Sequence, residues 1–322
     1  MNKKVALITG ISGQDGSYLA KFLLEKGYEV IGTIRSYRCV NTKNFDFLNI
    51  TSELIVDELD LLDMANVMRV LHKYNPDEIY NLAAQSSVGL SFSQPIGTFT
   101  FNTSSVNNLL EAIRLFNPRI KLYQASSSEM FGSVKELPIS LETPMHPISP
   151  YAVSKMASHY MVSTYRDAYQ LFICSGVLFN HESVLRSENF FIKKVIREAL
   201  NIKYGLQNEL YVGNLNLKRD FGYAPKYIEA MWLMMQEEVA DDFIICSGKS
   251  VLLQDIVEYI FDKLSLDKAL IVVDKSLFRP NETYEIVGDS TKAHEKLKWE
   301  YNYSFFDILD ILLKEEETRY AQ

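Results

Sequence analysis

A glycine-rich loop directly after a short apolar run constrains this chain more than any other feature of its sequence. The run Val5–Thr9 predicts a strand, and a helical pattern over Ser17–Glu25 follows the loop. Between them, Gly10 suits a tight turn, Gly13 a close backbone approach to a ligand, and Gly16 close helix packing. Because a helix N-terminus then points at the loop, the order of elements predicts a site for the pyrophosphate of a dinucleotide.

Short β-rich runs alternate with helical patterns through the rest of the first half. We expect strands at Glu29–Ile34, Glu78–Leu82, Lys121–Ala125 and Leu171–Leu178, and helices at Met64–Lys73, Asn107–Leu115 and Tyr151–Ala168. The apolar residues of these strands run almost without interruption, which is typical of strands buried on both faces. The alternation therefore predicts an α/β protein with a Rossmann-type, doubly wound parallel sheet.

The second half of the chain predicts a smaller, interleaved C-terminal substrate domain. We expect a helix at Glu188–Leu200, a strand followed by a loop within Leu210–Gly222, a helix at Tyr227–Gln236 and a buried strand at Phe243–Ser247. That last strand is apolar, like the expected strands of the first half, so we expect it to join the main sheet. We therefore expect residues 1–180, with return segments near 223–247, to hold the cofactor, and residues 181–322 to form mainly the substrate domain.

Composition narrows the class of protein. The 322 residues are 47% hydrophobic and 23% charged, as in globular proteins, which excludes disordered, collagen-like and coiled-coil chains. A net charge of −8 argues against nucleic acid or an anionic membrane as the main partner, although it allows a local basic pocket. Cys39, Cys174 and Cys246 are too few and too scattered for a disulfide framework or a metal site. With no apolar run near the ~20 residues that span a bilayer, we expect a soluble, cytoplasmic protein.

The end of the second strand indicates which dinucleotide binds. An NAD enzyme usually has an acid there, but this chain has Arg35, whose guanidinium suits a 2′-phosphate better than a hydroxyl. We therefore expect NADP; the alternative is that Arg35 is a solvated loop charge. Further cofactor contacts are expected from residues at later strand ends, namely Asp60 and Leu61 beside the adenine and Leu82, Ala83 and Ala84 against the cofactor backbone.

Tyr151 and Lys155 form the candidate catalytic pair. They lie four residues apart after Ser149 and Pro150, so they share one face of the expected helix. The ammonium group can then lower the pKa of the phenol and make it a usable base. Such a pair on an ordinary helix is more often structural, but a dinucleotide loop upstream favours the catalytic interpretation.

A serine cluster and one acid follow the strand Lys121–Ala125. Ser127 lies where ligands bind in doubly wound folds, although serines also form turns. Glu129 is unusual, because simple hydride transfer to a carbonyl needs no such acid. A carboxylate is needed if a carbon acid must lose a proton.

Taken together, seven blocks resemble the extended short-chain dehydrogenase/reductases, and within them the GDP-mannose 4,6-dehydratase family. The blocks are GISGQDGSYL, YNLAAQSSV, QASSSEMFG, SPYAVSK, LFNHES, VGNLNLKRDFG and FRPNE. Gln14 and Asp15 in the loop and the run Leu178–Ser183 are more specific to this family than the Tyr and Lys pair. The resemblance covers nearly the whole chain.

The resemblance implies a site, a reaction and an assembly. Ser127, Glu129, Tyr151 and Lys155 would be catalytic, and Gln14, Asp15 and His181 would join the cofactor contacts. The GDP-sugar would be held by Ser86, Asn180, Glu188, Lys194, Gly213, Arg219, Arg279 and Glu282. The implied reaction converts a GDP-hexose to a GDP-4-keto-6-deoxy sugar with tightly bound NADP, in a homo-oligomer that is a dimer or a tetramer.

Four departures from the family pattern leave the NADP preference and the exact hexose open. Ser36 replaces a second arginine, Ile148 replaces an arginine, Val184 and Leu185 replace a Pro-Arg pair, and the segment between Gly248 and Arg279 is shorter. GDP-mannose, a GDP-heptose and a GDP-N-acetylhexosamine are the substrates considered. Two rival functions are a GDP-4-keto-6-deoxy-sugar reductase or epimerase on the same fold, and a non-catalytic NADP-binding regulatory protein.

Overall fold

Seven parallel strands form the main sheet of the protein, whose computed structural model describes residues 3–39 and 42–320. Their spatial order is β10, β6, β5, β4, β1, β2, β3. Their bounds are β1 Val5–Thr9, β2 Glu29–Ile34, β3 Ile55–Glu58, β4 Glu78–Asn81, β5 Lys121–Ser127, β6 Ile173–Leu178 and β10 Asp242–Ile245. All neighbouring pairs are parallel, which confirms the doubly wound sheet.

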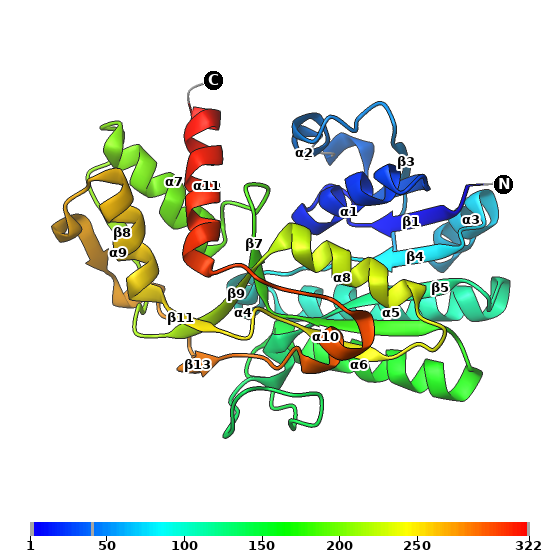
Figure 1. The fold of residues 1–322 in the computed structure, drawn as a ribbon. Helices are drawn as coiled ribbons and strands as arrows, with labels where there is room; N and C mark the ends of the chain where they lie inside the picture. Colours follow the sequence, from blue (N-terminus) through cyan, green and yellow to red (C-terminus); the bar gives the residue numbers. More distant parts are fainter. Residues whose placement is uncertain (1–2, 40–41, 321–322) are drawn as a thin grey trace.

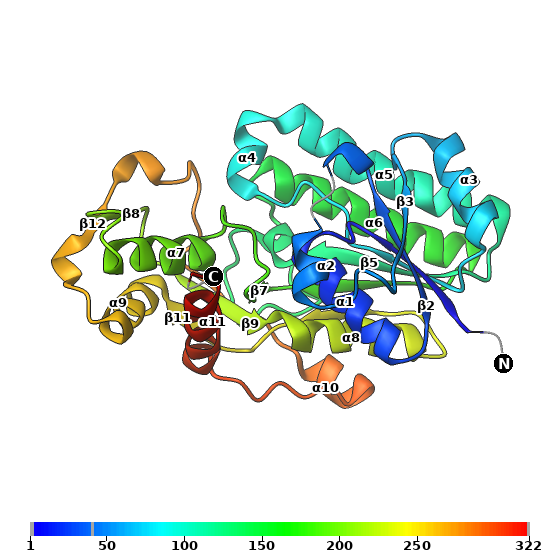
Figure 2. The ribbon, with the colours of Figure 1, turned by 90° about the horizontal axis from the view of Figure 1, so that it is seen from above.

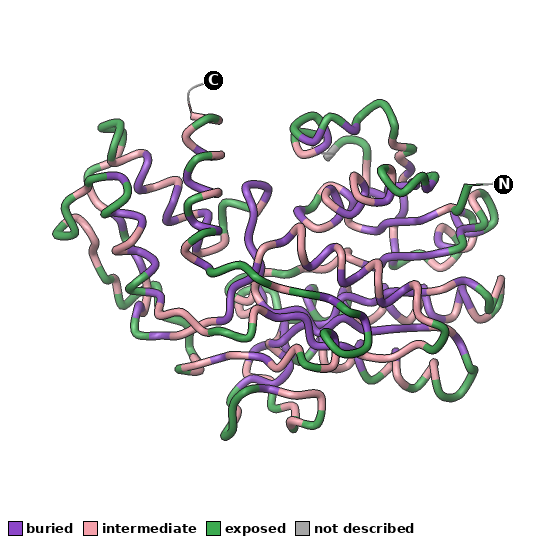
Figure 3. The backbone as a smooth tube through the Cα atoms, viewed as in Figure 1, coloured by how far each residue is buried: buried purple, intermediate pink, exposed green. Residues whose placement is uncertain are grey.

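Helices cover both faces of this sheet (Figure 1). On one face lie α1 (Gln14–Glu25) and α8 (Ala224–Gln236), and on the other lie α3 (Met64–Tyr74), α5 (Pro95–Phe116) and α6 (Pro150–Tyr169). Successive side chains of a strand point to opposite faces, so Ile8 belongs to the core under α1 and α8, and Leu7 to the core under α3 and α5. Figure 3 shows the strands of the sheet as a largely buried layer between these helices.

A second, smaller lobe lies beside the carboxyl ends of the sheet strands (Figure 2). It contains the helices α7 (Phe191–Lys203), α9 (Leu253–Leu264) and α11 (Phe305–Tyr320). Its strands are β7 (Asn180–Glu182), β8 (Leu210–Val212), β9 (Lys218–Tyr223), β11 (Ser250–Leu252), β12 (Ile271–Val273) and β13 (Glu285–Ile286). Val195, Ile256 and Ile308 are fully buried where its three helices meet, so this lobe has a core of its own.

The chain passes between the two lobes more than once. It leaves the sheet after β6, forms β7, α7, β8 and β9, and returns as α8 and the edge strand β10. It then builds β11 to β13 and places α10 (Thr291–Leu297) against α8 and β10 before ending in α11. The short helices α2 (Lys43–Phe47) and α4 (Val88–Ser93) lie in loops of the first lobe.

Several elements differ from the sequence-based expectation. Helix α7 begins at Phe191 rather than Glu188. A loop was expected over the end of Leu210–Gly222, but β9 forms there because it pairs with β7, β11 and β13. Helix α5 begins at Pro95 rather than Asn107. Its first turns contain Gly97, Thr98 and Thr100, which are poor helix formers, so packing rather than propensity determines that start.

The described helices and cysteines bear on two of the expectations from sequence. Within residues 3–39 and 42–320, every helix is too short or too polar to cross a bilayer. Cys174 and Cys246 are buried and unpaired, whereas the side chain of Cys39 lies outside the described part of the structure.

Candidate active site

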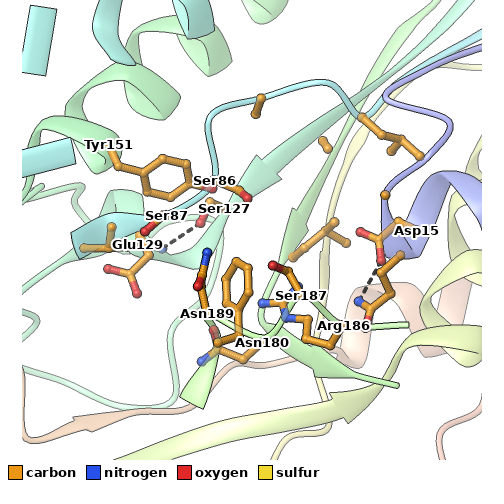
Figure 4. A pocket seen from close by; sticks show the side chains of 18 of the residues that line it. Asp15, Ser86, Ser87, Ser127, Glu129, Tyr151, Asn180, Arg186, Ser187 and Asn189 are labelled. Atoms are coloured by element: carbon orange, nitrogen blue, oxygen red, sulfur yellow. Dashed lines mark hydrogen bonds between the residues drawn. The ribbon is translucent and has the colours of Figure 1, made fainter. Parts of the chain in front are cut away.

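A cavity of about 790 Å³ opens at the carboxyl ends of the sheet strands, and the second lobe lines its other side (Figure 4). This is the edge at which doubly wound folds bind ligands, and the volume is typical of a small-molecule site. Most residues expected at the site line this one cavity: Gly10, Gly13, Gln14, Asp15, Gly16, Arg35, Asp60, Leu61, Leu82, Ala83, Ala84, Ser86, Ser127, Glu129, Tyr151, Lys155, Asn180, His181, Gly213, Arg219, Arg279 and Glu282.

The glycine loop has the shape that a dinucleotide requires. Gly10 has a φ of +69°, and a Cβ there would lie 3.0 Å from the backbone of Ala83. A Cβ on Gly16 would lie 2.4 Å from the carbonyl oxygen of Gly10. Gly13 caps α1 without any side-chain hydrogen bond, so the first N–H groups of the helix are left for a ligand. The loop therefore fits a pyrophosphate.

Asp15, in the first turn of α1, is paired with His181 of β7. The carboxylate oxygens lie 3.0 and 3.1 Å from His181 Nε2, and Gln14 Nε2 donates to both Asp15 Oδ1 and the His181 carbonyl. Burial favours the neutral carboxyl, but the charge and hydrogen bond of His181 outweigh it and lower the pKa of Asp15 to about 2. The pair therefore holds the glycine loop to the start of the second lobe.

The end of the cavity near β2 is open to solvent. Arg35 follows β2 directly, and its side chain is 73% exposed. Its guanidinium lies 3.9 Å from Asp60 Oδ2, on a side chain that is 42% exposed. Both groups are thus free to turn toward a ligand at little cost.

The opposite end holds the candidate catalytic pair, which is deeply buried. Tyr151 and Lys155 are 7% and 6% exposed, and both lie on the face of α6 that meets the end of β5. Lys155 Nζ donates to the Ala125 carbonyl at 2.7 Å. Burial lowers the pKa of Lys155 to about 8.

The pKa of Tyr151 is raised, and not lowered as expected from Lys155. Burial raises the pKa of Tyr151 to about 12; a hydrogen bond with Ser127 lowers it, and the charge of Glu129 raises it. Lys155 Nζ lies 6.0 Å from the centre of the phenol ring and is bound to the backbone instead. Desolvation therefore dominates the electrostatics of this end.

Glu129 lies beside the same tyrosine and faces the cationic side of the cavity. Its backbone N–H donates to Ser127 Oγ at 3.3 Å, which fixes the short helical turn after β5. Burial lowers the pKa of Arg219, whereas the negative charge of Glu129 raises it and the positive charge of Arg279 lowers it. Glu129 thus lines the same cavity as Tyr151 and the two guanidinium groups of Arg219 and Arg279. Figure 4 shows Glu129 and Tyr151 beside Ser127.

Two residues expected around the sugar nucleotide do not line the cavity. Glu188 is 62% exposed and pairs with Arg197 on α7. Lys194 Nζ donates to the Tyr211 carbonyl at 2.7 Å. The basic pocket expected from Lys194 and Arg219 is formed instead by Arg219 together with other arginines of the cavity.

Sequence reasoning missed the loop between β7 and α7. Its residues Arg186, Ser187, Asn189 and Phe190 line the cavity, and Figure 4 shows the first three beside Asn180. The guanidinium carbon of Arg186 lies 3.6 Å from the centre of the Phe190 ring, and Arg186 Nε lies 3.6 Å from Glu182 Oε2. The loop could have been predicted from its position in the sequence. It directly follows β6 and β7, whose ends lie at the cavity.

These features define a class of protein. They are a Rossmann-type fold with a glycine-rich βα loop after β1, a Tyr and Lys pair on α6 beside the end of β5, and a second lobe across the cavity. The fold of a dTDP-glucose 4,6-dehydratase from Streptomyces venezuelae with NAD bound agrees, with a TM-score of 0.87, 21% identity and 96% of each chain covered. RMD from Pseudomonas aeruginosa, complexed with NADPH, gives a TM-score of 0.81 at 24% identity, over 98% of this chain and all of that one (100%).

Sequence comparisons narrow the class to one family. The family model described as GDP-mannose 4,6 dehydratase matches residues 7–312. GDP-mannose 4,6 dehydratase 1 of Arabidopsis thaliana is 43% identical over 325 residues, covering 98% of this chain and 90% of that protein. A GDP-mannose 4,6-dehydratase of Vibrio cholerae is 40% identical, over 92% of this chain and 89% of that protein. The chain belongs to the GDP-mannose 4,6-dehydratase family, which confirms the resemblance found in its sequence.

Proposed function

We propose that this protein is a GDP-sugar 4,6-dehydratase, a hydro-lyase that converts GDP-mannose to its 4-keto-6-deoxy derivative. The observation that carries the proposal is one cavity in which Glu129 lies beside Tyr151 and opposite Arg219 and Arg279. A phenol can take the proton of a sugar hydroxyl during oxidation, and a carboxylate can take a carbon-bound proton during elimination. Two guanidinium groups can bind the diphosphate of a sugar nucleotide. A GDP-heptose or a GDP-N-acetylhexosamine remains within the same substrate class.

Nicotinamide dinucleotide is the cofactor in this proposal, and NADP its form. When bound, it supplies an acceptor that takes a hydride from the sugar and returns it. The first lobe, residues 1–180 with the return segment near 223–247, would hold it through the glycine loop and Leu82 to Ala84. His181 of β7, in the second lobe, would contribute through its pair with Asp15. Arg35, exposed at the end of β2, would bind the 2′-phosphate.

Each protein group then has one task. Tyr151, with Ser127 hydrogen-bonded to it and Lys155 beside it, takes the proton of the sugar 4-hydroxyl. The 4-ketone acidifies the C5 proton, which Glu129 removes while the C6 hydroxyl leaves as water. Hydride returned to C6 and a proton returned to C5 complete the 6-deoxy product, so no external reductant is consumed. The second lobe, mainly residues 181–322, would hold the GDP moiety through Asn180, Gly213, Arg219, Arg279 and Glu282, with Ser86 near the sugar.

The rival functions differ in what they require of this site. A reductase needs exchangeable NADPH and has no use for a base at C5, so Glu129 counts against it. A regulatory protein needs no catalytic set, yet Ser127, Tyr151 and Lys155 all lie in the cavity. We further propose a cytoplasmic homo-oligomer, a dimer or a tetramer, which sedimentation of the purified protein would measure.

An isotope experiment tests the reaction directly. The protein is incubated with GDP-mannose deuterated at C4, without reductant, and the products are analysed by mass spectrometry beside a panel of other GDP-sugars. We expect deuterium at C6 of the product, and in D₂O a second label at C5. Product without transfer from C4 to C6 would contradict the internal redox cycle, and product only with added NADPH would favour the reductase.

A further inference from the structure

The end of β5 is joined to α6 by three successive contacts, of which the catalytic pair uses two. Residues 125–127 face Tyr151, Lys155 and His159, which are spaced four apart along one face of the helix. Tyr151 bonds to the third of these strand residues and Lys155 to the first. The middle one, Ser126, has its hydroxyl 3.1 Å from His159 Nδ1. His159 thus continues the row of contacts one turn deeper into the fold.

The surroundings of His159 determine its proton. Its Nε2 lies 3.9 Å from Asp242 Oδ2 on β10, and Arg166 binds the two oxygens of that carboxylate at 2.8 and 2.7 Å. The pKa of His159 is below the ordinary value of histidine, mainly because the ring is buried. The negative charge of Asp242 opposes this shift, and the positive charge of Arg166 adds to it. The ring is therefore neutral near pH 7. Nδ1 accepts from the Ser126 hydroxyl in the tautomer with the ring proton on Nε2, and donates to the Ser126 oxygen in the other tautomer. Either tautomer joins the helix to the strand through this one contact.

We infer that His159 is a positioning residue, which holds α6 to the end of β5 and so fixes Tyr151 and Lys155 in the cavity. The inference rests on the proposed function, because those two residues act on substrate only if that function is right. His159 itself touches no cavity-lining group other than Ser126 among its described hydrogen bonds. It lies roughly 12 Å along the helix from Tyr151, at 1.5 Å per residue, so a small tilt at His159 displaces the phenol.

A purely structural role would predict something different. A buried histidine that only packs would alter the free energy of unfolding when replaced, and the active molecules that remain would react normally. A positioning role predicts a slower chemical step with substrate binding retained, since misplacement of a catalytic group by about 1 Å can cost up to about 100-fold. The two are separated by measuring the rate of hydride removal and the KM independently of the melting temperature.

Paired variants test the contact itself. His159→Phe and Ser126→Ala each remove the hydrogen bond, and His159→Asn keeps an acceptor near the position of Nδ1. Ser175→Ala is the matched control, because Ser175 lies on the next strand, β6, and its buried hydroxyl has no hydrogen-bond partner among the described residues. We expect a loss of about tenfold to 100-fold in single-turnover hydride removal from C4 for each of the first two variants, an unchanged KM, and near-normal rates for the asparagine variant and the control.

The double variant gives the decisive comparison. If Ser126 and His159 act through one shared contact, the double variant loses no more than either single variant. Losses that multiply, or single variants with the normal rate, would overturn the inference. So would a loss that follows the fraction of unfolded protein alone.

A second measurement does not depend on turnover. The Lys155 side chain is followed by ¹³C NMR of lysine-labelled protein, with the signal assigned from its absence in Lys155→Met. Burial keeps the pKa of Lys155 near 8, so loosening α6 in His159→Phe should raise the midpoint, while Ser175→Ala leaves it unchanged. An unchanged midpoint in His159→Phe would overturn the inference. If the wild-type protein converts no GDP-sugar, the proposed function fails, and this titration still decides the role of His159.

Discussion

The two ends of the cavity hold their charges in opposite ways. At the proposed catalytic end, Tyr151 and Lys155 are each less than a tenth exposed, and burial shifts the pKa of Tyr151 up to about 12 and that of Lys155 down to about 8. At the end near β2, Arg35 and Asp60 are 73% and 42% exposed and form a loose pair at 3.9 Å. Water screens the second pair and not the first. The catalytic end is therefore suited to moving protons, and the other end to selecting between ligands.

The largest expected effect is at the catalytic end. Glu129→Gln should retain cofactor binding but lose water elimination, because an amide cannot accept the C5 proton. Removal of a general base typically lowers the rate by ~10²–10⁴-fold. The measurement is formation of 4-keto-6-deoxy product by mass spectrometry, with Glu136→Gln, an exposed acid further along the same segment, as the control. Normal product formation in Glu129→Gln would show that Glu129 is not the base that removes the C5 proton.

Lys155 predicts a pH dependence of stability. Its pKa is about 8 in the folded protein and roughly 10.4 in the unfolded chain, so between these values the unfolded chain binds more protons. The free energy of unfolding should therefore increase with pH across that window, by about 3 kcal/mol for this one group. Below pH 8 the burial penalty is fully present.

Urea unfolding at pH 7 and pH 10 measures this contribution. The wild type should gain stability from Lys155 relative to Lys155→Met as the pH rises, whereas Lys135→Met, which alters an exposed lysine, should follow the wild type at both values. Parallel curves for the wild type and Lys155→Met would mean that the amine is better hydrated than its burial indicates.

The smallest expected effect is at the exposed end, and it concerns selectivity. Arg35→Ala should weaken NADP by about fivefold to tenfold and NAD hardly at all, since only NADP carries the 2′-phosphate and an exposed ion pair contributes modestly. Calorimetry at low and high salt measures both affinities, and salt should reduce the difference. Arg38→Ala is the matched control, because Arg38 is exposed nearby and does not line the cavity. Equal losses for the two cofactors would leave Arg35 as a solvated loop charge.

The sequence predicted the sheet lobe better than the second lobe, for a physical reason. The strands Val5–Thr9 and Glu29–Ile34 were predicted to the residue, because a parallel strand buried on both faces is apolar along most of its length. In contrast β9, with the sequence KRDFGY, is polar at both ends and exists through its pairing with three other strands. The first turns of α5 likewise depend on packing that local pattern does not encode.

The site follows the same division. Motif positions on the glycine loop, β5 and α6 were brought into one cavity as expected. Glu188 and Lys194 were placed by resemblance alone, and they point to Arg197 and Tyr211 instead. His159 contacts Ser126 and Asp242, which are at least 33 positions away from it in the sequence. A local motif therefore could not have predicted these contacts.

The late return of β10 to the sheet has a consequence for how the protein can be made. Until residue 245 is available, the apolar strand Ile173–Leu178 is an open sheet edge, and such edges template association between chains. At a synthesis rate of about 5–20 residues per second, the nascent chain carries that edge for several seconds while β7, α7 and β9 are being added. A fragment cut near residue 180 would carry it permanently. The first lobe therefore needs β10, from much later in the chain, to complete its sheet. We expect the nascent chain to need chaperones most during this interval.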